Sequence, residues 1–125
     1  MKRIILLFSC LLILQGCYYD KGQQLYPSNA NSTTCDTTSV SYSSVIKPIL
    51  DQYCGVAGCH DAITVANGYD YTKYSGIQLS ASHGRLIGSI NQASGYLPMP
   101  QSATKIPQCD IDKMTAWVNA GYPNN

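Results

Sequence analysis

One stretch constrains this chain more than any other: CGVAGCH, from Cys54 to His60. Two thiols and an imidazole this close together suit three chemistries, namely a metal site, a local disulfide beside an unrelated histidine, or covalent attachment of a haem. The compartment of the chain helps to decide among them, because thiols pair mainly outside the cytoplasm.

The first residues have the pattern of a secretory signal peptide. Two cations precede an apolar run from Ile4 to Leu14, which is too short for a membrane span. The run leads into LQGC, which resembles the lipobox of bacterial lipoproteins, where the signal is removed before the cysteine and that cysteine is acylated. We therefore expect a signal peptide at 1–16 and a lipid anchor on Cys17 that binds the protein to a membrane.

The anchor predicts a location in the bacterial envelope, facing the periplasm or the cell surface. Tyr18 follows Cys17 in place of the aspartate that some bacteria use to retain lipoproteins in the inner membrane, so the outer membrane is favoured. Residues 18–34 are rich in Ser, Asn, Gln and Thr and have no helical or strand periodicity. This composition predicts a flexible tether at 17–34 and one domain at 35–125.

The charge balance argues against nucleic acid as a partner. Without the cations of the signal peptide, Lys2 and Arg3, six basic residues stand against seven aspartates, a net charge of −1. Such a chain has no excess of basic residues for contacts with phosphates.

The cysteines divide by position. Of six, Cys10 leaves with the signal peptide and Cys17 takes the lipid. Four remain, and an even set in an oxidising compartment is normally paired, with three possible connectivities. The four are Cys35, Cys54, Cys59 and Cys109.

Apolar periodicity predicts an all-α domain with helices over 43–54, 82–92 and 109–121. Ser43 or Ser44 is the expected cap of the first. Gly68 and Gly76 interrupt the stretch after the CGVAGCH motif, which predicts a loop with a short helical turn at 71–74. Prolines predict irregular structure over 95–108.

Haem attachment requires a histidine directly after the second cysteine, as at Cys59 and His60, so that the imidazole reaches the iron. The usual sequence has two residues between the cysteines, and this chain has four. Small residues at 55, 57 and 58 would let the extra length bulge outward. Two alternatives stay open: zinc with a fourth ligand such as His83, and a Cys54–Cys59 disulfide.

The rest of the chain resembles the class I c-type cytochrome domain of small bacterial lipoproteins. The counterparts are, in order, VIKPILDQYC, the CGVAGCH motif, GRLIGSI, PMP and CDIDKMTAWVNAG, and they cover about 35–125. The resemblance implies a helical domain wrapped around one covalent haem c. It makes Cys54 and Cys59 the thioether donors, His60 the proximal iron ligand and Met99 the distal one.

Other residues receive structural roles. Met114 is expected in the core, His83 as an exposed capping residue at the start of the helix over 82–92, and Trp117 where the first and last helices cross. Once the haem takes its two cysteines, Cys35 and Cys109 are left to form a disulfide.

The resulting hypothesis is an electron-transfer protein and not an enzyme. It would carry single electrons between redox partner proteins in the envelope. One alternative is a haem enzyme or gas-binding module with an open sixth iron position. Another is a haem-free, disulfide-bonded structural lipoprotein.

Overall fold

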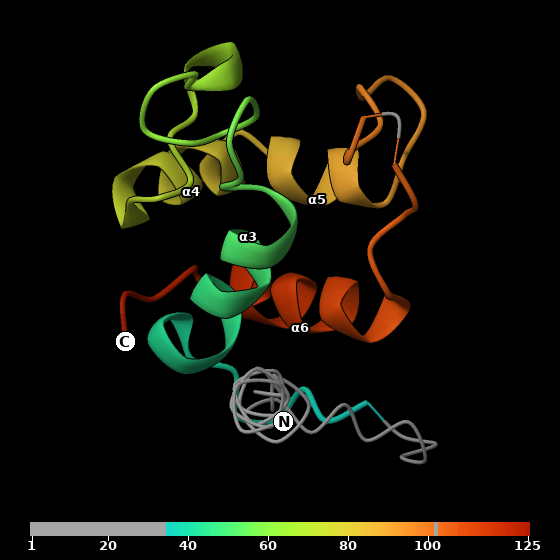
Figure 1. Cartoon of the computed structure of the whole chain (residues 1–125). Helices are drawn as coiled ribbons and strands as arrows, with labels where there is room; N and C mark the ends of the chain where they lie inside the picture. The colour runs from blue at the N-terminus through green and yellow to red at the C-terminus, as the bar shows by residue number, and fades with distance from the viewer. Residues whose placement is uncertain (1–34, 102) are drawn as a thin grey trace, which may run out of the picture. The chain divides into compact units, whose positions relative to one another are not determined.

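Helices make up the regular structure of residues 35–101 and 103–125, which the computed structural model describes. No strand occurs in these two ranges, so the predicted all-α class is confirmed for them. The elements, in chain order, are η2 (Tyr42–Ile46), α3 (Lys47–Tyr53), η3 (Ala66–Gly68), α4 (Tyr74–Ser82), α5 (Arg85–Ile90) and α6 (Gln108–Asn119) (Figure 1).

The predicted signal peptide at 1–16 and tether at 17–34, with the lipidated Cys17, lie outside the described residues. Within the part that is described, no helix has the length and apolar character needed to cross a membrane. The predicted haem domain at 35–125 therefore contains all the structure discussed below.

The first helix starts earlier than its sequence pattern indicates. Ser41 is the N-cap of η2, and its hydroxyl accepts a hydrogen bond from the Ser44 N–H at 3.3 Å. A serine hydroxyl in this place satisfies one of the N–H groups that a helix start leaves without a partner. The expected cap at Ser43 or Ser44 is therefore wrong by two or three residues.

The first turn is also wider than an α-helical turn. The Ile46 N–H donates to the Ser41 carbonyl at 3.2 Å, and the Lys47 N–H donates to the Tyr42 carbonyl, both five residues back. Pro48 has no N–H to donate, and its ring crowds the carbonyl four residues earlier. A π-type turn relieves this conflict before the chain tightens into α3.

The helix α4 corrects the predicted loop. Gly76 was expected to interrupt the chain, yet Tyr74–Ser82 is helical. A Cβ atom at Gly76 would lie 1.9 Å from the Asp70 carbonyl oxygen, so only glycine permits this close approach. The approach packs α4 against the preceding turn, and Ile77 and Ala81 become buried. This burial outweighs the helix propensity lost at glycine, about 1 kcal/mol relative to alanine.

The predicted helix at 82–92 is shorter in the structure, Arg85–Ile90. Gly84 has a φ of 69° and separates α5 from α4, a left-handed conformation that glycine adopts without strain. Leu86 and Ile90 of α5 are buried, as their spacing indicates.

The last helix, α6, covers most of the predicted range 109–121, and its apolar stripe is buried. Met114 and Trp117 are both completely buried, which confirms their expected places in the core. The ring centroids of Trp117 and Tyr42 are 5.8 Å apart, so Trp117 packs where the first and last helices meet, as predicted. The helix α5 contacts both α4 and α6, and Figure 1 shows α4 and α5 on the side of the domain opposite α6.

A disulfide joins Cys35 to Cys109, with their Cα atoms 5.4 Å apart and a sequence separation of 74. It connects the segment before η2 to the first turn of α6. The predicted pairing is thus confirmed.

Candidate functional site

The position of Cys54 at the end of α3 places it in the interior of the domain. The helix ends at Tyr53, and Cys54 is its C-cap, with its N–H bonded to the Leu50 carbonyl at 2.8 Å. The Cys54 side chain is buried beside the core residues Ile49 and Leu50. The first cysteine of the motif is therefore placed by the helix and not by the loop that follows.

The residues between the cysteines bulge outward, as the sequence predicts for a lengthened motif. Three of the four, Val56, Ala57 and Gly58, are exposed and Gly55 is half-buried. Cys59, which follows them, is exposed as well. The His60 N–H donates to the Cys54 carbonyl at 3.1 Å, which closes the base of the bulge. Gly58 has a φ of 82°, a conformation that a residue with a side chain rarely adopts.

His60 lies at the base of this bulge and is buried, with 7% of its surface exposed. Its Nδ1 is 3.1 Å from the Tyr69 carbonyl oxygen, which only accepts hydrogen bonds, so Nδ1 carries the proton. In the neutral ring the lone pair is then on Nε2, the arrangement found in histidines that ligate metal ions.

Tyr71 fixes the plane of the same imidazole. Its ring stacks on His60 with centroids 4.3 Å apart and planes 17° apart, and its N–H donates to the His60 carbonyl at 2.8 Å. The Tyr71 hydroxyl is bonded to the Ser80 hydroxyl at 2.6 Å, which ties the stack to α4. Burial raises the pKa of Tyr71 to about 12, so its hydroxyl stays protonated at neutral pH.

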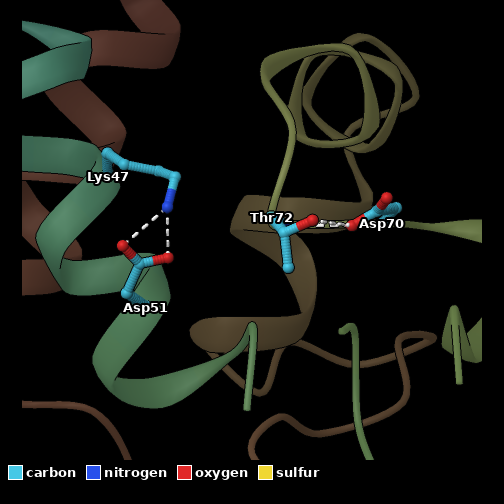
Figure 2. A network of polar contacts seen from close by, with 4 residues as sticks. All are labelled: Lys47, Asp51, Asp70 and Thr72. Carbon is cyan, nitrogen blue, oxygen red and sulfur yellow. Dashed lines mark hydrogen bonds and ion pairs between the residues drawn. The ribbon is translucent and has the colours of Figure 1, made fainter. Parts of the chain in front are cut away.

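The turn around Tyr71 is built from its two neighbours. The Asp70 carboxylate accepts hydrogen bonds from the Thr72 hydroxyl and, at 3.0 Å, from the Thr72 N–H (Figure 2). Hydrogen bonding from Lys73, 2.8 Å away, and from Thr72 holds the pKa of Asp70 below its usual value. Figure 2 also shows the Lys47–Asp51 ion pair on the first helix. The ion pair lies on the surface and stabilises little.

Asp61 is a positioning residue that the sequence prediction missed. One carboxylate oxygen accepts from the Gly58 N–H at 2.7 Å, and the other accepts from the N–H groups of Ile63 and Thr64 at 2.7 and 2.9 Å. These bonds, led by that from Thr64, lower the pKa of Asp61, so the carboxylate is ionised across the physiological range. An aspartate directly after the motif and three residues before a threonine is the turn pattern that could have revealed it.

Both motif cysteines are free thiols, so the Cys54–Cys59 disulfide left open by the sequence is not formed in the structure. Their surroundings differ, because Cys54 is buried and Cys59 is exposed. Burial, together with the nearby Cys59, raises the pKa of Cys54 to about 12. The Cys54 sulfur is therefore held as a neutral group.

A zinc site finds no support in the described geometry. Across 35–101 and 103–125, no three His, Cys, Asp or Glu side chains gather into a group that could bind a metal. His83, the other candidate zinc ligand, is exposed as predicted. It is the C-cap of α4, however, and the expected cap at the start of the next helix is Gly84 instead.

Met99 lies half-buried on the irregular segment between α5 and α6, as expected for its proline-rich surroundings. Its N–H donates to the Ser89 carbonyl of α5 at 3.0 Å, so this segment is attached to α5. In Figure 1 the segment and the loop containing the CGVAGCH motif both extend to the side opposite α6.

Comparison with known proteins gives no family or function for the chain. No protein-family model matches the chain, and no curated protein or solved structure matches it.

Proposed function

We propose that the chain is a membrane-anchored, mono-haem c-type cytochrome that carries single electrons between redox partner proteins of the bacterial envelope. The observation that supports this most is the combination at the motif: two free thiols, and a buried histidine whose Nδ1 is bonded to the Tyr69 carbonyl. This donor set fits a covalent haem, because it offers two sulfurs for thioether bonds and one nitrogen for iron.

In this proposal Cys54 and Cys59 form the thioether bonds and His60 is the proximal ligand. A bound haem supplies reversible one-electron chemistry at iron. The chain holds the imidazole in one tautomer through the Tyr69 carbonyl and in one plane through the Tyr71 ring. Both contacts limit movement of the ligand when the charge of the site changes.

Met99 is the proposed distal ligand. A thioether ligand raises the reduction potential of a haem protein, which suits an electron carrier. Met114 is the alternative methionine of the domain, but it is completely buried in the core on α6. If the sixth position is instead open, the haem enzyme or gas-binding alternative applies.

The anchor completes the proposal. Cleavage after residue 16 and acylation of Cys17 would tether the domain to the outer membrane through residues 17–34. The domain would then exchange electrons with partners in the periplasm or at the cell surface.

The covalent haem is tested by producing the chain in a bacterium with a haem-attachment system. We expect the intact mass to exceed that of the polypeptide by one haem, and the visible spectrum to change on reduction as expected for a low-spin cytochrome. Replacing both Cys54 and Cys59 with serine should abolish the covalent adduct, because both thioether bonds are lost. The matched control, serine at Cys35 and Cys109, should retain it. A wild-type mass that shows the polypeptide alone would contradict the proposal.

The distal ligand is tested by replacing Met99 with alanine in the haem-loaded protein. We expect loss of the weak far-red absorption of methionine-ligated ferric iron, rapid carbon monoxide binding to the ferrous protein and a lower reduction potential. Met114→Ala is the control, expected to cost about 2–5 kcal/mol of stability while leaving the spectrum unchanged. Rapid carbon monoxide binding by the wild-type protein would favour the open-site alternative.

A further inference from the structure

The segment that contains Met99 is held against α5 by two backbone hydrogen bonds. The Ala93 N–H donates to the Gly88 carbonyl and the Met99 N–H to the Ser89 carbonyl, each at 3.0 Å. Two adjacent residues of α5 therefore accept bonds from both sides of the stretch 94–98.

Between these two bonds the aromatic ring of Tyr96 lies directly on the helix backbone. A Cβ atom at Gly88 would be 2.5 Å from two carbon atoms of the ring, a distance at which one of the two groups must move. The Tyr96 hydroxyl reaches further along the helix, to 3.7 Å from the Cβ position of Gly84. The same side chain therefore covers Gly84, the N-cap of α5, and Gly88 inside the helix, two positions that have no side chain.

Glycine at position 88 has a cost that local structure does not explain. It lies inside α5 without a positive φ, where alanine would be the better helix former. Contact with Tyr96 accounts for it, because any larger residue would displace the ring. The ring in turn precedes Met99 by three residues, so its position limits where the methionine side chain can reach.

We propose that Tyr96, seated on Gly88, is the positioning residue that keeps Met99 in place as an axial ligand. This inference rests on the proposed function. Without the contact, the Met99 segment would keep only its backbone bonds to α5, and the methionine sulfur would be held less firmly in the position of an axial ligand. Tyr96 would thereby set how easily an external ligand takes the sixth position.

The test compares Tyr96→Ala, Gly88→Ala and Tyr96→Phe in the haem-loaded protein. We expect Tyr96→Ala and Gly88→Ala to bind carbon monoxide in the ferrous state at least tenfold faster than wild type and to lose most of the far-red band. Tyr96→Phe keeps the ring and should behave as wild type. In the double variant, Gly88→Ala should add nothing to Tyr96→Ala, because the ring that it displaces is already absent.

A second readout does not depend on ligand binding. Amide hydrogen exchange at Met99 should be at least tenfold faster in Tyr96→Ala, because its bond to the Ser89 carbonyl opens more often. Val118→Ala, a change to a partly buried residue of α6, is the control for a general loss of stability. It should leave both the far-red band and the Met99 exchange rate near their wild-type values.

The outcomes separate the two proposals. If the wild-type protein contains no haem, the proposed function fails and the role of Tyr96 fails with it. If haem is attached and the Tyr96→Ala variant keeps the wild-type carbon monoxide rate and Met99 exchange, only the positioning role is overturned. An effect of Val118→Ala equal to that of Tyr96→Ala would also overturn it. Should Gly88→Ala fail to fold, Tyr96→Ala still decides, since Tyr96 is 39% exposed and outside the core.

Discussion

Replacing Trp117 with alanine is expected to lower the free energy of unfolding by about 3–5 kcal/mol, the range for loss of a large buried aromatic side chain. Trp117 is completely buried, and its ring packs near those of Tyr42 and Tyr122. Its Nε1–H also donates to the Pro123 carbonyl at 2.9 Å. The loss is a large part of the stability of a small domain, about 5–15 kcal/mol. Urea denaturation followed by circular dichroism measures it.

The matched control is Trp117→Phe. It keeps an aromatic ring in the core but removes the hydrogen bond to Pro123, so its effect should be clearly smaller. If the free energy of unfolding of Trp117→Ala lies within about 1 kcal/mol of the wild-type value, the indole does not hold the first and last helices together.

Removing the disulfide with the double change Cys35→Ser and Cys109→Ser is expected to lower the free energy of unfolding by about 4 kcal/mol. The reason is that the unfolded chain regains the conformational entropy of a long loop that the bridge closes. The sequence separation of 74 between the two cysteines sets this magnitude. Urea denaturation of both forms gives the difference.

Chemical reduction offers a comparison within the wild-type sequence. Treatment with a thiol reductant should lower the stability of the wild-type protein to that of the double serine variant, and it should not affect the variant. A double variant as stable as the oxidised wild type would show that the bridge does not restrict the unfolded chain.

The sequence predicted best the features that depend on local periodicity or on counting. The spacing of Ile111, Met114 and Trp117 indicates one buried stripe on α6, and the structure buries all three. The Cys35–Cys109 bridge followed from assigning the other cysteines first. These predictions do not depend on knowing which helices pack against each other.

The helix α4 could not be predicted in this way. Glycine lowers helix propensity, so Gly76 argues against a helix when only the local sequence is considered. Its advantage becomes visible in the fold, where a Cβ atom at Gly76 would lie 1.9 Å from the Asp70 carbonyl oxygen. The π turn of η2 was missed for a related reason, since Pro48 is tolerated in a first helical turn in more than one way.

The candidate site divides in the same manner. Cys54, Cys59 and His60 are adjacent in the chain and were found as a motif. Tyr69 and Tyr71 join His60 only through the fold, by a hydrogen bond at 3.1 Å and a ring stack at 4.3 Å. Tyr69 contributes its backbone carbonyl, which no pattern of side chains in the sequence reveals.

The burial of Cys54 has a consequence for how the protein is made. Only 7% of this residue is exposed once the chain has folded, whereas Cys59 is exposed. A thiol that folding hides can react with a bulky cofactor only while the chain is open. In the proposed cytochrome, the cofactor would therefore have to be attached before the chain folds, and a chain that folded first would remain an apoprotein with one thiol out of reach.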